Sequence, residues 1–350
     1  MNYTIKGKIV GMFSDIHIGI MQDNPMWHSE ILKIAEWIKE EYQKLGINDI
    51  IIPGDIFHNR SEISVNTISV ANSFFKILKD FKIYISTGNH DCYYKDSSEI
   101  NSISIFEGWN NITIIDKEPV ILKYKNKEIS LIPWATDLEK IPNTDICFGH
   151  FEIQSFYMNT FKVCEHGLES KNILKKSPFV ISGHFHNKDD RKYELGRILY
   201  LGSPYQQNFG DCEQIRGIYT LNLETEEIVF IENTISPKHI KIALSDFKKP
   251  DISSTLKKVV PNNIISFIID DDISIEKIDL LSSAIKKLNP VMFRIDYTYE
   301  EIKNVENSKN VEYSLIDIEE TIEDFVNSID IEHKNEVISY ISEIYNTISK

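Results

Sequence analysis

The hydrophobic and polar positions of the first 90 residues alternate between two periods. Short apolar runs are typical of buried strands, and longer segments with an apolar residue every three or four positions are typical of helices. The pattern predicts, in order, a strand over 8–14, a helix with apolar positions between 31 and 42 that ends at Gly46, a strand over 50–52, a helix over 62–79 with Ser61 as its N-cap, and a strand over 82–86. Strands that alternate with helices indicate a parallel sheet with right-handed crossovers.

After Trp109 the chain changes to short β segments separated by turn residues. The predicted strands span 112–115, 120–124, 128–133, 146–148, 179–181, 197–201, 217–223 and 228–235. Two of them, 146–148 and 179–181, are wholly apolar, as in strands buried on both faces. We therefore expect two stacked sheets flanked by helices.

The pattern changes again near Ser236, where a smaller unit begins. Its predicted elements are strands over 240–244, 264–269 and 291–297 and a helix from the N-cap Ser274 to Leu288, enough for a small α/β module.

The last part of the chain, 299–350, is predicted to be a linker followed by helices. Residues 299–310 are polar and charged, and the segments 318–329 and 337–348 have the apolar stripe of amphipathic helices. The expected domains are therefore 1–235, 236–298 and 299–350.

The composition is typical of a protein in a reducing compartment. Apolar residues make up 42% of the chain, and no apolar run approaches the roughly 20 residues of a membrane helix. The first residues do not follow a secretory signal pattern, and the four cysteines show no CxxC spacing. We expect a cytoplasmic location, in the host if the chain is viral, with no membrane contact, no zinc knuckle and no disulfide framework.

The net charge of −15 would by itself argue against a nucleic-acid partner, because Lys and Arg drive phosphate binding. However, residues 301–350 hold twelve acidic side chains against four lysines, a net charge of −8. The other 300 residues therefore carry only −7, and the imbalance does not exclude such a partner.

Histidines, aspartates and an asparagine stand at the carboxyl ends of five predicted strands, and these motifs contain six of the ten histidines. The residues are Asp15 and His17, Asp55 and His58, Asn89 and His90, His150, and His184 with His186. Residues two apart in extended chain point the same way, and in open α/β sheets the carboxyl ends of the strands form the ligand crevice. We therefore expect the five motifs to converge.

Their donor atoms indicate metal ions, and more than one. Imidazoles, carboxylates and a carboxamide, without a thiolate, suit Mn²⁺, Fe²⁺ or Zn²⁺ in catalytic rather than closed structural sites. Two divalent ions would outweigh the charges of Asp15 and Asp55, and the resulting positive site would attract a phosphate.

Taken in order, the motifs resemble the signature of the calcineurin-like metallophosphoesterases. They are SDIH at 14–17, GDIFH at 54–58, GNHD at 88–91, GH at 149–150 and GHFH at 183–186. The resemblance implies a four-layer α/β/β/α sandwich, here with a small α/β capping domain and a C-terminal helical segment.

Further segments are similar to the DNA double-strand-break repair nucleases of this superfamily, bacterial SbcD and the nuclease subunit of the T-even-type phage recombination endonuclease. They are LIPW at 131–134, GHFE at 149–152, EHGLE at 165–169, YLGSPYQ at 200–206 and RGIY at 216–219. The similarity implies a DNA exonuclease and endonuclease with two Mn²⁺, for which Mg²⁺ or another divalent ion is an alternative. It also implies a homodimer and an SbcC-like ABC-type ATPase docked on the C-terminal helices.

The family pattern implies the ligands of both ions. One ion would be held by Asp15, His17, Asp55 and His186, and the second by Asp55, Asn89, His150 and His184. Asp55 would thus bridge the two, as in two-metal sites where ions about 3.5–4 Å apart stabilise the attacking and leaving oxygens of an in-line displacement.

Other residues are expected beside the ions. His90 matches the family histidine that assists the transition state or the leaving oxygen, and His58 matches a position behind the ligands or in contact with phosphate. Tyr205, Gln206 and Arg216 follow a strand near the site and are expected either to contact DNA or to support the β segments.

Two alternative functions remain open. One is a phosphomonoesterase or small-molecule phosphodiesterase on the same core, although the protein phosphatases of this superfamily carry GDxVDRG and GNHE where this chain has GDIFHNR and GNHD. The other is a non-catalytic scaffold in which the metals hold the fold and the C-terminal segment recruits the ATPase. Activity on phosphodiesters, on phosphomonoesters or on neither separates the three.

Overall fold

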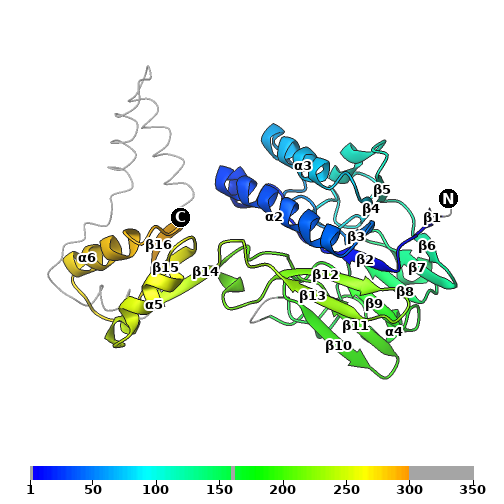
Figure 1. Ribbon diagram of the computed structural model, residues 1–350. Coiled ribbons are helices and arrows are strands. Elements are labelled where there is room, and N and C mark those ends of the chain that lie inside the picture. The colour runs from blue at the N-terminus through cyan, green and yellow to red at the C-terminus, as the bar shows by residue number, and fades with distance from the viewer. Residues whose placement is uncertain (1–2, 159–161, 299–350) are drawn as a thin grey trace, which may run out of the picture.

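The computed structural model describes residues 3–158 and 162–298. The larger part of the fold consists of two stacked sheets, and the smaller part of a three-stranded sheet with its own helices (Figure 1). Within the described ranges, every helix is too short or too polar to span a bilayer. The helices predicted over 318–329 and 337–348 lie outside the described residues.

The first sheet has six strands and carries the predicted parallel alternation. β2 (Ile9–Met12), β3 (Asp49–Pro53), β4 (Lys82–Ser86) and β5 (Ile112–Ile115) run parallel, and β12 (Gly217–Asn222) and β13 (Ile228–Glu232) extend the sheet antiparallel beyond β2. The crossovers are α2 (Pro25–Lys44) and α3 (Val65–Ile77), which lie together on the outer face of this sheet (Figure 1).

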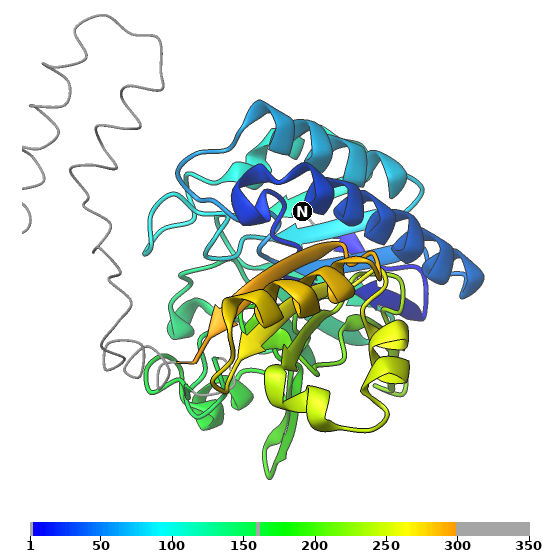
Figure 2. The same cartoon turned by 90° about the vertical axis from the view of Figure 1, so that its left-hand side faces the viewer.

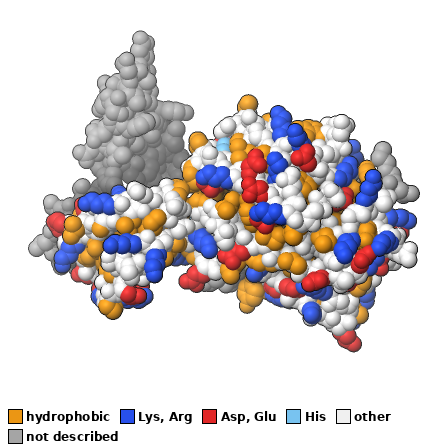
Figure 3. All heavy atoms as spheres, in the orientation of Figure 1, with side chains coloured by type: hydrophobic (Ala, Val, Ile, Leu, Met, Phe, Trp, Pro, Cys, Tyr) orange, Lys and Arg blue, Asp and Glu red, His pale blue; other side chains and the backbone are white. Residues whose placement is uncertain are grey.

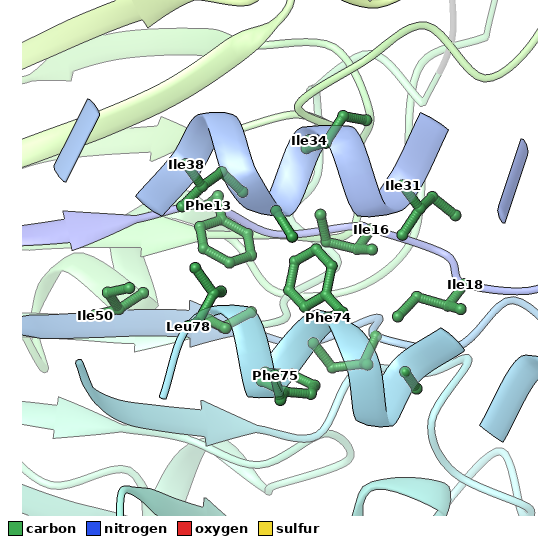
Figure 4. Packing of buried hydrophobic residues seen from close by; sticks show 14 of the residues in the cluster. Phe13, Ile16, Ile18, Ile31, Ile34, Ile38, Ile50, Phe74, Phe75 and Leu78 are labelled. Atoms are coloured by element: carbon green, nitrogen blue, oxygen red, sulfur yellow. The ribbon is translucent and has the colours of Figure 1, made fainter. Parts of the chain in front are cut away.

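Apolar side chains of the two crossover helices form a continuous core with this sheet. Ile31, Ile34 and Ile38 recur at helical spacing on α2 and are fully buried. They lie close to Phe13, just after β2, and Phe74 of α3 (Figure 4). Burial of each such side chain contributes roughly 1.5–3 kcal/mol. This packing on the outer face of the sheet therefore fixes the positions of the strands and of their carboxyl ends.

The second sheet has seven strands and packs against the inner face of the first. In sheet order these are β1 (Tyr3–Thr4), β6 (Val120–Tyr124), β7 (Lys127–Leu131), β8 (Ile146–Gly149), β9 (Phe179–Ser182), β11 (Gly196–Tyr200) and β10 (Asp189–Tyr193). Met12 and Ile51 from one sheet and Phe148 and Ile181 from the other belong to the buried core between them. The short helix α4 (Ser170–Leu174) and loops cover the outer face, so the predicted four-layer arrangement is confirmed.

The smaller sheet is parallel and lies at one end of the molecule. It contains β14 (His239–Ala243), β15 (Ile264–Ile269) and β16 (Met292–Tyr297), with α5 (Ile252–Val259) and α6 (Ile275–Lys286) on one face. Figure 2 looks onto this unit, with the larger part of the fold behind it. The expected small α/β module is therefore present.

Several short elements complete the fold. They are the helical turn α1 (Ile20–Asp23) and the 3₁₀ helices η1 (Ser102–Phe106), η2 (Leu138–Lys140), η3 (Phe209–Asp211) and η4 (Leu244–Lys248).

The main difference from the sequence pattern is the start of α3. The prediction placed the N-cap at Ser61, but the helix begins at Val65 because the Ser64 hydroxyl accepts a hydrogen bond from the backbone N–H of Thr67 (3.0 Å). The pattern also missed β10, a polar edge strand, and α5, whose only buried residue is Leu256. Neither element presents an apolar face of the length that periodicity detects.

Candidate metal centre

The loops that follow five strands meet at one edge of the sandwich. β2, β3 and β4 of the first sheet are followed by Asp15 and His17, by Asp55, and by Asn89, and β8 and β9 of the second sheet are followed by His150 and by His184 and His186. The expected convergence of the motifs is therefore observed. The site joins both sheets, since each contributes ligand atoms.

Four of these residues form the first group of donor atoms. The Nε2 atoms of His17 and His186 lie 3.0 Å apart. The Oδ1 atom of Asp15 lies 4.0 Å from each of these nitrogens, and Asp55 Oδ2 lies 3.5 Å from His17 Nε2. Both carboxylates and His17 are buried. The residues assigned to one ion by the family pattern thus face one another.

The second group is arranged around Asn89. Its Oδ1 atom lies 2.9 Å from His150 Nε2 and 2.9 Å from His184 Nδ1. His150 Nε2 lies 3.2 Å from Asp55 Oδ2, so Asp55 stands between the two groups. This is the position that a bridging carboxylate requires.

The lone pairs at the second group require a positive charge. The Nδ1–H of His150 donates to the Pro53 carbonyl (2.8 Å), so its Nε2 presents a lone pair to Asn89 and Asp55, whose oxygens are also acceptors. Either a proton or a cation must lie among them. Burial lowers the pKa of His150. The nearby charge of Asp55 outweighs this effect and raises the pKa of His150 to about 9.

Each of the two groups of donor atoms could hold a divalent ion. Two ligand atoms about 2.1 Å from one ion lie roughly 3–3.5 Å from each other, and most of the spacings above fall near this range. Asp15 Oδ2 is buried and has no hydrogen-bond partner within residues 3–158 and 162–298. In addition, burial lowers the pKa of His17 and of His186, so these imidazoles are neutral and present lone pairs.

The backbone at the proposed ligands is unusual. Asp15, His17, Asp55 and His184 have positive φ values of 58°, 51°, 55° and 89°. A non-glycine residue in this region costs roughly 1–2 kcal/mol, and such conformations cluster at functional sites. Four of the seven proposed ligand residues are thus held in place by a strained backbone. The periodicity of the sequence does not reveal this strain.

Gly88 allows the loops after β3 and β4 to approach closely. A Cβ atom at this position would lie 2.2 Å from Asp55 Oδ1 and 2.5 Å from the Asp55 backbone nitrogen. Any larger residue would displace Asp55, which explains the glycine in physical terms.

Asp91 is a structural residue of the site that the sequence pattern did not single out. Its carboxylate accepts four backbone N–H groups, those of Asp55, Ile56, Phe57 and Gly88, at 2.9–3.1 Å. Burial and the nearby charge of Asp55 raise the pKa of Asp91 to about 7, although the backbone hydrogen bonds act to lower it. Asp91 therefore fixes the loop that carries Asp55. Its place in the GNHD motif was the available signal.

His90 and His58 lie beside the first group of donors. The ring of His90 is 4.8 Å from that of His17, and the ring of His58 is 5.5 Å from it. The Nδ1–H of His90 donates to the carbonyl of His58 (2.6 Å), so Nε2 is the nitrogen left to exchange a proton. Burial lowers the pKa of His58, and His17, His58 and His90 also have nitrogens close enough to bind one ion.

Two further residues flank the second group and were not predicted. Glu152 Oε1 accepts from His184 Nε2 (3.2 Å), which lowers the pKa of Glu152 and directs His184 Nδ1 toward Asn89. Trp134 lies with its ring 5.5 Å from that of His184 and 5.8 Å from that of His150. Both residues occur in motifs that carried the resemblance, LIPW and GHFE.

Tyr205, Gln206 and Arg216 are buried beneath the site and bind other parts of the chain. The Tyr205 hydroxyl donates to the Ile16 carbonyl (2.8 Å), and Arg216 pairs with Asp211 (2.7 Å). Gln206 accepts from the backbone of His239 and donates to that of Gln214. These contacts support the fold, and a contact of the three residues with DNA stays a prediction.

A family model described as calcineurin-like phosphoesterase matches residues 10–197. The chain is 28% identical to exonuclease subunit 1 of Enterobacteria phage T4, over 91% of this chain and 96% of that protein. It is also 29% identical to the uncharacterized protein R555 of Acanthamoeba polyphaga mimivirus, over 28% of this chain and 7% of that protein.

Two solved structures are similar to this one at lower sequence identity. An archaeal phosphodiesterase shares 14% identity over 64% of this chain and 99% of its own, with a TM-score of 0.36. A dimetal phosphatase from Danio rerio shares 11% identity over 64% of this chain and 95% of its own, with a TM-score of 0.43.

Proposed function

Because the chain belongs to the calcineurin-like phosphoesterase family, we propose that it is a metal-dependent DNA nuclease that hydrolyses phosphodiester bonds with two Mn²⁺ ions. The single observation that carries the proposal is the pair of donor groups that share Asp55 at the junction of the two sheets. The similarity to an exonuclease subunit over most of both chains supports DNA as the substrate.

The proposed ligands are those of the two donor groups. Asp15, His17, Asp55 and His186 would hold one ion, and Asp55, Asn89, His150 and His184 the other. Bound together, the ions would activate water and neutralise charge on the phosphate oxygens during an in-line displacement.

His90 would act on the leaving oxygen. Its Nδ1–H is held by the His58 carbonyl, so a proton carried on Nε2 can pass to the oxygen that departs from phosphorus. The His58 ring packs 5.7 Å from that of His90 and would hold it in orientation or contact a phosphate oxygen. Glu152 would keep His184 in the orientation that presents Nδ1 to the site.

Replacement of His90 by alanine tests this function. We expect kcat on linear duplex DNA with Mn²⁺ to fall by about 10²–10⁴-fold, the usual contribution of a general acid. Metal binding should persist, because the backbone N–H of residue 90, which donates to Asp55 Oδ1 (2.9 Å), is unchanged. Nuclease assays and calorimetric titration with Mn²⁺ measure the two effects.

His166→Ala is the matched control, since His166 is an exposed histidine outside both donor groups. It should cleave DNA at the wild-type rate. Wild-type activity of the His90→Ala variant would refute the role of His90. Hydrolysis of phosphomonoesters alone by the wild type would favour the phosphomonoesterase alternative, and no hydrolysis at all, even with the ATPase, would favour the scaffold.

The acidic balance of the chain suits a nuclease that shares DNA binding with a partner. On the face seen in Figure 3, basic and acidic side chains are interspersed rather than gathered in one basic patch. We propose that residues 1–235 form the nuclease domain, 236–298 a DNA-binding cap, and 299–350 a segment that binds an SbcC-like ATPase. Homodimerisation, a cytoplasmic location, and a role in recombination and double-strand-break repair are part of the same proposal.

Truncation after Asn310 tests the partner. The shortened chain should keep its metal binding and a weak nuclease activity, because the described donor groups lie before residue 190. It should lose its association with an SbcC-like ATPase from the same source, measured by co-purification. Co-purification of the truncated chain with the ATPase would contradict the assignment of 299–350.

A further inference from the structure

An exposed loop leaves the metal centre directly after Asp91. Its two ends are joined by the bridge between Cys92 and Asn101 and by the hydrogen bond from the Tyr93 backbone N–H to the Ile100 carbonyl (2.9 Å). Both Cys92 and Asn101 are buried. The base of the loop is therefore fixed, and it begins two residues beyond His90.

Trp134 ties the tip of this loop to the second donor group. Its indole Nε1–H donates to the Lys95 carbonyl (2.8 Å), and its backbone N–H donates to the Thr87 carbonyl just after β4. The same ring lies 5.5 Å from that of His184. The loop is thus linked to the metal centre twice, through the chain to His90 and through Trp134 to His184.

The loop presents aromatic surface to solvent. Tyr93 and Tyr94 are each 50% exposed, and their rings meet edge to face at 4.9 Å. Ile100, across the base of the loop, is 57% exposed. Within residues 3–158 and 162–298, neither tyrosine hydroxyl makes a hydrogen bond, and neither ring belongs to a buried core cluster. Large apolar groups gathered at the edge of a reaction centre mark a binding surface.

We propose that Tyr93 and Tyr94 form a stacking subsite for an unpaired nucleobase next to the phosphodiester in the metal centre. The inference rests on the proposed function and adds that the DNA substrate is unpaired beside the bond that is hydrolysed. Every base has a π-face, and base–aromatic stacking binds single strands without sequence preference. Bases in a duplex are already stacked, so the subsite favours a frayed end or a single strand over intact duplex.

The experiment uses the full chain with Mn²⁺ and two single-stranded oligonucleotides, one intact and one with abasic residues at both ends. In the variant Tyr93→Ala/Tyr94→Ala, KM for the intact strand should rise about tenfold, while kcat stays unchanged, because stacking holds substrate and transition state alike. For the wild type, removal of the bases should raise KM by a similar factor. The alanine variant should show no further rise on the abasic strand, since the two changes remove one interaction.

Two variants control for damage to the loop. Tyr93→Phe/Tyr94→Phe keeps both rings and should retain the wild-type KM. Tyr157→Ala removes a tyrosine of equal exposure, 50%, from another loop and should also leave KM unchanged. An alanine variant whose KM on the intact strand stays within twofold of the wild type would overturn the inference, as would an equal rise in KM on both strands. If the wild type cleaves linear duplex DNA but neither single strand, the subsite is refuted and the proposed function stands. If it cleaves no DNA at all, the proposed function fails and the subsite with it.

Discussion

Replacement of Asp55 by asparagine is expected to remove most of the Mn²⁺ binding and nearly all hydrolysis. The Asp55 carboxylate faces both sets of donors, with Oδ2 3.5 Å from His17 Nε2 and 3.2 Å from His150 Nε2. An amide carries no charge, and its nitrogen cannot bind a cation. Mn²⁺ affinity should fall by more than about 100-fold, because even residues that merely orient a ligand contribute 10–100-fold. The rate should fall on the order of a thousandfold or more, since each ion stabilises the transition state by several kcal/mol.

Asparagine is the suitable replacement because it tolerates the positive φ of this position, 55°. Calorimetric titration with Mn²⁺ and a nuclease assay measure the two losses. Asp49→Asn is the control, since Asp49 is a buried aspartate at the opposite end of the same strand, β3. It should bind Mn²⁺ as the wild type does. Binding of two Mn²⁺ ions with wild-type affinity by Asp55→Asn would disprove the bridging role.

The second large effect is expected on stability, from Asp91→Asn. The carboxylate of Asp91 accepts four buried backbone N–H groups with its two oxygens. The amide can accept with one oxygen only, and its NH₂ group then faces two donors. Each buried donor left without an acceptor costs about 1–3 kcal/mol, so the loss of two acceptors should lower the free energy of unfolding by about 2–6 kcal/mol.

The measurement is the urea midpoint in buffer with a metal chelator, which excludes an indirect effect through bound ions. Asp145→Asn serves as the control, because Asp145 is exposed and accepts a single backbone N–H, that of Glu128 (2.8 Å). Its midpoint should differ little from that of the wild type. An Asp91→Asn variant that unfolds at the wild-type midpoint would show that the four hydrogen bonds do not hold the loop.

The sequence predicted the parts of the site that depend on local pattern. An apolar strand followed at once by Asp15 and His17, or by Asp55, places these residues at a sheet edge, because the strand end is readable from hydrophobicity alone. The strand 82–86 has the predicted bounds, and Asn89 lies three residues beyond its end. The convergence of the loops then follows from parallel topology.

The parts that could not be predicted depend on contacts between distant segments. Nothing near Asp91 in the sequence shows that it accepts N–H groups from residues 55–57, because these lie over 30 positions away. Trp134 and Glu152 likewise act on His184 only after the second sheet is in place. The wrong N-cap of α3 has a local cause, since Ser61 and Ser64 are both suitable cap residues and only the folded backbone selects between them.

The origin of the donors in both sheets has a thermodynamic consequence. His17 and His186 are 169 positions apart in the chain, yet their nitrogens are 3.0 Å apart. An ion held by such a pair would cross-link the two sheets and would bind the folded chain far better than the unfolded one. By mass action, an ion concentration 100-fold above its dissociation constant adds about 2.7 kcal/mol to the unfolding free energy. The stability of this fold would then depend on the concentration of the ions, and the protein would resist unfolding best where they are abundant.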